Sequence, residues 1–159
     1  MIRTGIGFDA HAFARHRKLV IGGVTIPHHK GLAGHSDADV LVHAVIDAIL
    51  GATAMGDIGV LFPSDDDKYK EINSLKLLKE TCNVINNKGF QIINIDSTII
   101  LQSPKIQSYI PDMRLNISRV LNIDISQVSV KATTTDFLGF TGRKEGVAVL
   151  AIATLEHRI

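Results

Sequence analysis

The segment from 146 to 155, GVAVLAIATL, is the feature that most restricts how this chain can fold. It is a near-continuous run of apolar residues without proline. A helix that crosses a bilayer needs about 18 to 20 apolar residues, so this run is too short to span a membrane. Its composition predicts instead a strand that is covered on both faces. The chain is therefore expected to form a sheet with packed layers on either side.

The remaining segments predict an α+β fold, a mixed β-sheet with helices packed on one face. Hydrophobic periodicity, β-branched residues and turn signals mark the elements. The predicted strands are 2–9, a hairpin over 19–26, 90–101, 128–132 and 146–157, and the predicted helices are 36–52, 71–88 and 103–121. No repeat, low-complexity tract or linker interrupts residues 1–159, which predicts a single domain.

Local signals place the ends of these elements. Gly22 and Gly23 supply the positive φ angles of a two-residue hairpin turn. Ser36, with Asp39 three residues later, resembles a capping box at the start of the first helix. Ser103 and Pro104 are expected as N-cap and first turn of the third helix, with an irregularity at Pro111.

The apolar strands also predict an oligomer. If the helices cover one face of the sheet, the strands need another cover on the opposite face. A second copy of the same chain is the simplest cover, so we expect a symmetric homo-oligomer.

Composition limits the partners and the compartment. The chain has 17 Lys and Arg against 16 Asp and Glu, a net charge of +1. This balance gives no reason to expect nucleic acid or an anionic membrane as a partner. The single cysteine, Cys82, cannot form an intramolecular disulfide and is predicted to be a core residue. The segment MIRTGIGFDAH has neither a signal-peptide nor a transit-peptide pattern, which predicts a cytoplasmic protein.

The histidines indicate where the chemistry lies, because six of the seven fall in the first 43 residues. Asp9 and His11 project to the same side of an extended segment, and His43 would reach in from the first helix. Two imidazoles and one carboxylate leave a coordination position open, as a catalytic zinc requires. Asp39 or Asp47, four residues to either side of His43, could orient its second ring nitrogen.

The same three residues allow other interpretations. Asp9 could be a capping carboxylate and His43 a hydrogen-bonded core histidine. Two histidines and a carboxylate also form the facial triad of non-haem Fe(II) oxygenases, although those enzymes are usually double-stranded β-folds. A third alternative is a trimeric small-molecule-binding protein with a structural zinc, against which an open coordination position argues.

Three other segments suggest a phosphorylated small molecule. HSDAD, residues 35–39, begins a predicted helix whose free backbone N–H groups attract anions. The loop GDIGVLFPSDD, residues 56–66, has two glycines that let a ligand approach the backbone. TTTD, residues 133–136, offers hydroxyl donors and a carboxylate for a phosphate and a magnesium-type ion. A plain N-cap, a flexible connection and a polar loop are the ordinary alternatives.

Two cations add to this pattern. Arg143 could clamp a phosphate, or it could form a surface pair with Glu145. Lys105 could touch a phosphate, although a solvated lysine is the default. Together the residues favour a metal-assisted reaction of a phosphorylated small molecule, without identifying it.

Six motifs in order carry a more specific resemblance. They are GFDAHAF, GLAGHSDADVLVHAVIDAILGA, GDIGVLFPSDD, STIILQSPK, IPDMR and VKATTTDFLGFTGRKEGVA. In this order and at these separations the chain closely resembles the 2-C-methyl-D-erythritol 2,4-cyclodiphosphate synthases of the non-mevalonate isoprenoid pathway, from about residue 3 to the end.

The resemblance implies a CMP-releasing lyase. Its substrate is 4-diphosphocytidyl-2-C-methyl-D-erythritol 2-phosphate, and its products are 2-C-methyl-D-erythritol 2,4-cyclodiphosphate and CMP. Asp9, His11 and His43 resemble the zinc ligands. Asp136 resembles the residue at a second divalent ion, Mg²⁺ or Mn²⁺. His35 and Thr134 match the positions that steady the transition state.

The resemblance also implies the substrate contacts. Around the methylerythritol phosphate and the metals these are Asp9, His11, His35, Ser36, Asp57, Ile58, Gly59, Phe62, Pro63, Ser64, Asp65 and Asp66. Around the cytidine and the diphosphate they are Leu101, Gln102, Ser103, Pro104, Lys105, Ile106, Gln107, Thr133, Thr134, Thr135 and Asp136, with Phe140 and Arg143 as further contacts.

The implied assembly is a homotrimer whose three sheets face a central cavity and whose active sites lie between neighbours. Arg143 and Glu145 match residues lining that cavity, which would have room for an isoprenoid diphosphate. The chain departs from the family pattern at Asp136, where Glu is expected, at Ser64, where an acid is common, and at Leu101, where a smaller residue is expected. These departures bear on the second metal and the pocket, because none of them touches the zinc ligands.

Overall fold

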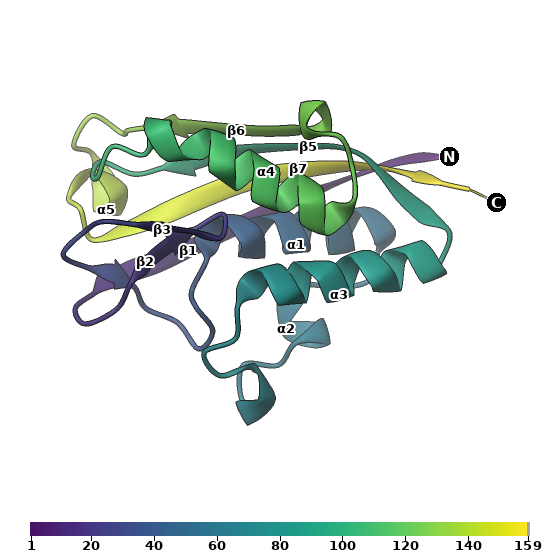
Figure 1. Cartoon of the computed structure of the whole chain (residues 1–159), viewed down its shortest axis with the longest axis horizontal. Coiled ribbons are helices and arrows are strands. Elements are labelled where there is room, and N and C mark those ends of the chain that lie inside the picture. The colour runs from purple at the N-terminus through teal and green to yellow at the C-terminus, as the bar shows by residue number, and fades with distance from the viewer. Residues whose placement is uncertain (159) are drawn as a thin grey trace.

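A computed structural model describes residues 1–158 and confirms the α+β class, with a five-stranded mixed sheet and helices on one face (Figure 1). The strand order is β4–β1–β7–β5–β6. The strands are β1 (Ile2–Ala14), β4 (Gly31–Leu32), β5 (Phe90–Ile100), β6 (Val128–Thr133) and β7 (Gly146–His157), and β2 (Leu19–Ile21) pairs with β3 (Val24–Ile26) in a separate hairpin. The helices are α1 (Val40–Thr53), α2 (Ile58–Leu61), α3 (Ser74–Asn87), α4 (Ile110–Leu121) and α5 (Gly139–Gly142), with 3₁₀ turns at Asp67–Tyr69, Gln107–Tyr109 and Ile125–Gln127.

The apolar C-terminal segment forms β7, the central strand of the sheet. It pairs antiparallel with β1 and β5, and β5 in turn pairs parallel with β6. Its side chains alternate, with Val147, Val149 and Leu155 fully buried under the helices and Leu150 and Ile152 on the opposite face. The near-continuous apolar run thus supplies both faces of one strand.

Helix α1 lies directly against the sheet because β1 has no side chains where the two elements cross. A Cβ atom on Gly5 would lie 2.0 Å from the carbonyl oxygen of Ala48, and one on Gly7 would lie 1.9 Å from that of Ala44. The backbones therefore approach more closely than any side chain would allow. Because α1 also packs against other helices, most of its residues are buried.

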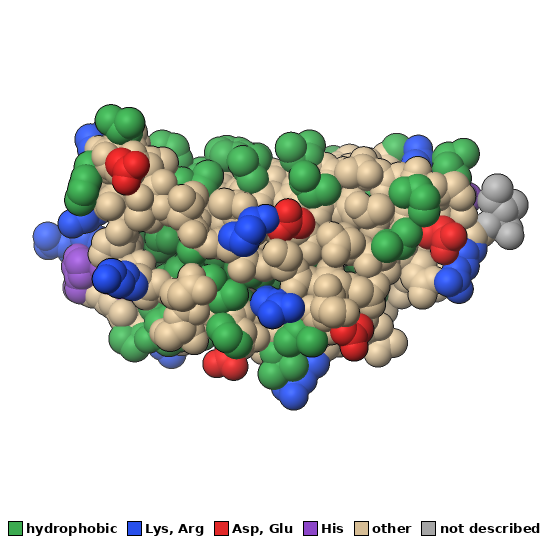
Figure 2. All heavy atoms as spheres, turned by 90° about the horizontal axis from the view of Figure 1, so that it is seen from above, with side chains coloured by type: hydrophobic (Ala, Val, Ile, Leu, Met, Phe, Trp, Pro, Cys, Tyr) green, Lys and Arg blue, Asp and Glu red, His purple; other side chains and the backbone are tan. Residues whose placement is uncertain are grey.

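The other face of the sheet is open in the single chain. Ile6, Phe8, Leu150 and Ile152 lie side by side in the β1–β7 ladder and are 69%, 57%, 41% and 44% exposed. Seen from the side away from α1 and α3, the molecule shows groups of hydrophobic side chains, with a pair of oppositely charged side chains near the middle (Figure 2). This face matches the prediction that the sheet needs a second cover. No helix within residues 1–158 is long and apolar enough to cross a membrane.

The structure confirms the hairpin and corrects the end of the first strand. Gly22 and Gly23 have φ angles of +60° and +72°, as the predicted turn requires. Strand β1 does not end at Asp9 but runs to Ala14, because its ladder with β7 continues through Ala12 and Gly146. The residues after Asp9 have little sequence preference for a strand, but their hydrogen bonds to β7 keep the backbone extended.

The first and third helices begin later than predicted. Helix α1 starts at Val40 with Asp39 as its N-cap, so Ser36 forms no capping box and lies in the preceding loop. Helix α4 starts at Ile110 with Pro111 in its first turn, whereas Ser103 and Pro104 belong to an irregular loop and share a cis peptide bond. Proline is favoured in the first turn of a helix, so Pro104 and Pro111 each fit that place by sequence. The tertiary packing decides that the helix begins beside Pro111.

The β1–α1 contact generates a stability prediction. Gly7→Ala is expected to lower the free energy of unfolding by about 1 to 3 kcal/mol, because its Cβ would collide with the backbone of Ala44. The control is Gly51→Ala in α1, where the nearest atom would lie 3.7 Å away. Alanine is a better helix former than glycine, so this variant is expected to be neutral or more stable by up to about 1 kcal/mol. Urea unfolding of both variants checks the pair, and equal effects would contradict the close-approach argument.

Candidate metal centre and adjoining cavities

Asp9, His11 and His43 converge at one point between β1 and α1. The Asp9 Oδ2 atom lies 2.8 Å from Nε2 of His11 and 3.2 Å from Nδ1 of His43. The two ring nitrogens lie 3.3 Å apart, and all three ligand atoms fall within 4.8 Å of one another. All three residues are partly buried. The expected ligand trio is therefore brought together by the close packing of α1 on β1.

The outer ring nitrogens show how each imidazole is oriented. Nδ1 of His11 lies 2.6 Å from the carbonyl oxygen of Ala33, which can only accept a hydrogen bond, so this nitrogen carries a proton. Nε2 of His43 lies 2.9 Å from the hydroxyl of Ser74 and 3.1 Å from that of Ser36. The Ser74 hydroxyl donates to Asp37, which leaves its lone pairs to accept from His43.

This arrangement fits a bound cation. With their outer nitrogens protonated, neutral His11 and His43 turn two lone pairs toward the Asp9 carboxylate. Three electron-rich atoms at such short distances repel one another unless a proton or a metal ion lies among them. Outer hydrogen bonds of this kind fix the tautomer of metal-ligating histidines. The donor set is that of a divalent metal site with an open position.

The titration behaviour of the ligands agrees with this geometry. When a proton and not a metal ion lies among the three inner atoms, burial raises the pKa of Asp9, but the hydrogen bonds with His11 and His43 outweigh burial and lower it to about 2. Burial lowers the pKa of His11, but the hydrogen bond to Asp9 outweighs it, and the net shift is upward. Asp9 is therefore an anion over the whole range in which the protein would work, which holds positive charge at this point.

Neither aspartate of α1 orients His43, contrary to the expectation. The Asp39 carboxylate accepts from the backbone amides of Val42, Gly22 and Gly23, and so joins the helix to the β2–β3 hairpin. Complete burial raises the pKa of Asp39, and the charge of Asp37 raises it further. Asp47 accepts from the amide of Ile58 instead and anchors α2. Ser36 and Ser74 take the place that the aspartates were expected to fill.

A cavity of about 310 Å³ opens beside the ligand trio. Its lining includes many of the residues implied for the methylerythritol phosphate, and its members are Asp9, His11, His35, Ser36, His43, Ile58, Gly59, Phe62, Ser64, Tyr69 and Leu77. Asp57, Pro63, Asp65 and Asp66 do not line it. Asp57 caps α2, and the carbonyl of Asp66 lies 3.0 Å from Nε2 of His35, so both help to shape its loops.

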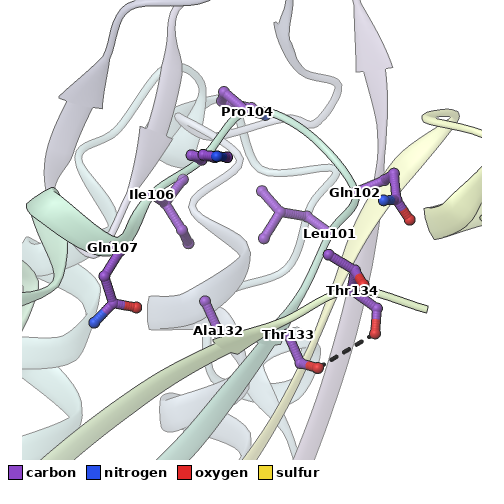
Figure 3. A pocket seen from close by; sticks show the side chains of 9 residues that line it. Leu101, Gln102, Pro104, Ile106, Gln107, Ala132, Thr133 and Thr134 are labelled. Atoms are coloured by element: carbon purple, nitrogen blue, oxygen red, sulfur yellow. Dashed lines mark hydrogen bonds between the residues drawn. The ribbon is translucent and has the colours of Figure 1, made fainter. Parts of the chain in front are cut away.

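A second cavity, of about 180 Å³, lies between the loop after β5 and the end of β6 (Figure 3). Leu101, Ile106 and Ala132 form its apolar floor, and hydroxyls and amides lie around its edge. The lining residues are Leu101, Gln102, Pro104, Lys105, Ile106, Gln107, Ala132, Thr133 and Thr134. The loop predicted for cytidine therefore forms a pocket, and Ser103 is the one residue from 101 to 107 outside its lining.

The two cavities are separated within one chain. Ala10, between Asp9 and His11, stands in register with Ala148, Ile100 and Thr133 across the sheet. Three strand spacings, roughly 14 Å, therefore separate the ligand trio from the second cavity.

The remaining predicted residues follow β6 and lie outside both cavities. Asp136 is exposed and lies 3.4 Å from the hydroxyl of Thr134, so it does not join the Asp9 cluster. Thr135 hydrogen-bonds the carbonyl of Leu138 and is tied to its own loop. Phe140 is exposed, and Arg143 pairs with Glu145 at 2.9 Å.

Ser74 and Asp37 are the contributors that sequence reasoning missed. Ser74 is the first residue of α3, 31 positions from His43, and no local spacing connects the two. Asp37 accepts from both the backbone amide and the hydroxyl of Ser74. Tyr69 and Leu77 in the first cavity were missed for the same reason, because only tertiary packing brings them there.

Ser74→Ala tests this outer support. The variant leaves His43 with Ser36 as its partner and leaves Asp37 without the hydroxyl, so metal affinity is expected to fall about 10- to 100-fold. Competition with a chelator checks this value. Ser108→Ala, an exposed change in the turn before α4, serves as control and is expected to keep wild-type affinity. Unchanged affinity in Ser74→Ala would show that Ser36 alone orients the ring.

Comparison with known proteins places this geometry in a family. The model of the YgbB family matches residues 2–156. The 2-C-methyl-D-erythritol 2,4-cyclodiphosphate synthase of Clostridioides difficile is 58% identical over 154 residues, which are 97% of this chain and 96% of that protein. That of Clostridium kluyveri is 56% identical over 158 residues, covering 99% of this chain and 96% of its own.

Solved structures agree with the sequence comparison. The bifunctional IspDF of Campylobacter jejuni matches with a TM-score of 0.96 and 47% identity over 99% of this chain, and this chain spans 43% of that protein. IspF of Plasmodium falciparum, in a complex with CDP, matches with a TM-score of 0.86 and 37% identity over 99% of this chain and 97% of its own. The chain therefore belongs to the YgbB family, whose curated relatives are 2-C-methyl-D-erythritol 2,4-cyclodiphosphate synthases.

Proposed function

We propose that this chain converts 4-diphosphocytidyl-2-C-methyl-D-erythritol 2-phosphate to 2-C-methyl-D-erythritol 2,4-cyclodiphosphate and CMP by metal-assisted phosphoryl transfer. The observation that carries the proposal is the Asp9–His11–His43 trio, with an open cavity beside it, in a chain of this family. The CDP complex of the Plasmodium falciparum relative supports a nucleotide-linked substrate.

The reaction needs no covalent intermediate with the protein. An oxygen of the 2-phosphate forms a bond to the β-phosphorus, while the bond from that phosphorus to the bridging oxygen breaks. CMP leaves with the electron pair. Such a transfer depends on holding the two phosphates in line and on neutralising their charge.

Asp9, His11 and His43 are the residues that would hold a zinc ion. When bound, zinc would align and polarise the reacting phosphates. The chain itself keeps both imidazoles in the ligating tautomer through Ala33 and Ser74. The pocket therefore requires little rearrangement to receive a cation, which favours tight binding.

His35 and Thr134 are proposed to steady the transition state from opposite sides. His35 lies at the first cavity and is held by the carbonyl of Asp66. Thr134 lies at the second cavity, beside Asp136, which we propose as the residue for Mg²⁺ or Mn²⁺ near the leaving group. The shorter aspartate side chain suits contact through water as well as directly.

The separation of the two cavities supports a homotrimer with shared active sites. One chain keeps its metal centre roughly 14 Å from its own nucleotide pocket, but a neighbouring chain could place its pocket against that metal centre. The open apolar face gives such chains a surface to pack on. Arg143 and Glu145 are exposed and are proposed to line the central cavity between subunits, where an isoprenoid diphosphate would fit.

The activity is tested by CMP release, with the cyclic product identified by phosphorus NMR. Wild-type protein with zinc and magnesium is expected to release CMP, and EDTA is expected to abolish release. Asp9→Asn is expected to lower bound zinc and to slow turnover at least about a hundredfold, because it removes a ligand charge. Asp112→Asn, an exposed change in α4, is the control for the loss of one charge.

The outcomes separate the alternatives. Wild-type zinc content and CMP release in Asp9→Asn would refute the ligand assignment. Folded, zinc-loaded protein without any product would favour the binding-protein alternative. A redox-active iron after aerobic purification would favour the oxygenase alternative.

The assembly is tested on the open face. Wild-type protein is expected to have the mass of a trimer in light scattering. Phe8→Asp is expected to shift the mass to that of a monomer, because a charge would be buried without a partner between the sheets. Ile125→Asp, an exposed site before β6, is the control and is expected to remain trimeric. A monomeric wild type would contradict the proposal.

A further inference from the structure

A third cavity, of about 310 Å³, is lined mostly by cationic and histidine side chains. It lies where the loop after the β2–β3 hairpin meets the loop before β7, at the end of the molecule opposite the chain termini. Its lining is Phe13, His28, His29, Lys30, Ser103, Arg143 and Lys144. Figure 2 shows histidine and Lys or Arg side chains gathered at this end. We refer to it as the basic cavity.

The basic cavity is distinct from the sites described above. None of its lining residues lines either of the other two cavities. Side chains alternate along β1, so Phe13 points to the same side as Asp9 and His11, which is the helix side of the sheet. It does not point to the open face that is proposed to enclose the central cavity. The basic cavity shares Ser103 with the implied substrate contacts and Arg143 with both those contacts and the proposed central cavity, so only His28, His29, Lys30 and Lys144 are taken as its own ligand-binding residues.

Two of the three Lys and Arg side chains in the basic cavity have no carboxylate partner in the described part of the chain. Arg143 pairs with Glu145 at 2.9 Å. Within residues 1–158, neither Lys30 nor Lys144 has a carboxylate oxygen within 4.0 Å, and no acidic side chain lines the cavity. Like charges that share a concave surface repel one another, and a bound anion would relieve that repulsion.

His28 and His29 lie close together in the basic cavity, and the positive charge around them affects the pKa of His28. Their ring centroids lie 4.3 Å apart, and His28 also packs 5.6 Å from the ring of Phe13. Burial lowers the pKa of His28, and the charges of His29 and Lys30 lower it further. An adjoining cavity lined by His16, Arg17 and Lys18 reaches the same histidines and adds to the positive potential that attracts anions.

We propose that the basic cavity binds the phosphate or diphosphate group of a small anionic ligand. Two ammonium groups and two imidazoles offer several N–H donors to one group of oxygens, the pattern that recognises phosphate. The volume of the cavity suits a small molecule. The proposal is independent of the proposed catalytic function, because it uses none of the metal ligands.

Titration calorimetry with inorganic phosphate and with pyrophosphate tests the proposal on the full-length protein. Wild-type protein is expected to bind both, with pyrophosphate tighter because it offers more charge. Lys30→Gln with Lys144→Gln is expected to weaken binding at least about tenfold, the loss of one or two charge-assisted hydrogen bonds. Lys76→Gln with Lys79→Gln, two exposed positions of α3, removes the same charge elsewhere and is expected to leave binding unchanged.

Two further measurements assign the binding to this cavity. In protein from which metal has been removed, so that the Asp9 site offers phosphate no cation, Asp9→Asn is expected to bind phosphate as tightly as wild type, which excludes the metal centre as the binding site. Sulfate, which is also tetrahedral and carries two negative charges near neutral pH, is expected to compete with phosphate for the cavity, because its oxygens accept from the same N–H donors. Equal affinity in the Lys30/Lys144 variant, loss of binding in Asp9→Asn, or no phosphate binding by wild-type protein would each overturn the proposal.

Discussion

The contact between β1 and α1 is the constraint on which the site depends. Gly5 and Gly7 leave no side chain between the strand and the carbonyl oxygens of α1, so the two backbones meet directly. The next inward residues of the strand are Asp9 and His11, and the residue beside Ala44 is His43. The same packing that buries the sheet therefore brings the three ligands within reach of one ion.

Hydrogen bonds from distant segments then orient what the packing brings together. The carbonyl of Ala33 faces one imidazole, and the hydroxyl of Ser74 at the start of α3 faces the other. Asp39 plays a parallel structural part, because one buried carboxylate caps α1 and satisfies two amides of the β2–β3 hairpin. A buried anion with several N–H donors is stable where an unpaired one would be costly. The metal centre thus depends on the hairpin, on α1 and on α3 together.

Charge is distributed unevenly in a chain that is nearly neutral overall. The Asp9 cluster is an acidic centre that attracts a cation, and the basic cavity at the hairpin end attracts an anion. The open face of the sheet exposes Ile6, Phe8, Leu150 and Ile152 side by side and is suited to packing against another copy. The Asp9 cluster, the basic cavity and the open apolar face therefore differ in their chemistry and lie at separate places around one sheet.

The sequence by itself determined the α+β class, the apolar C-terminal strand, the Gly22–Gly23 turn and the Asp9, His11 and His43 trio that could hold a metal ion, because each rests on local periodicity, local φ preferences or the chemistry of a few side chains. Tertiary structure decided where helices begin and which groups support the site. The capping-box pattern placed the start of the first helix at Ser36, yet Asp39 caps it, and the same carboxylate accepts from the hairpin amide of Gly22. Aspartates four residues from His43 were expected to orient it, yet Ser74 does so from another helix. Such partners are separated by many residues, and only the folded packing makes them neighbours.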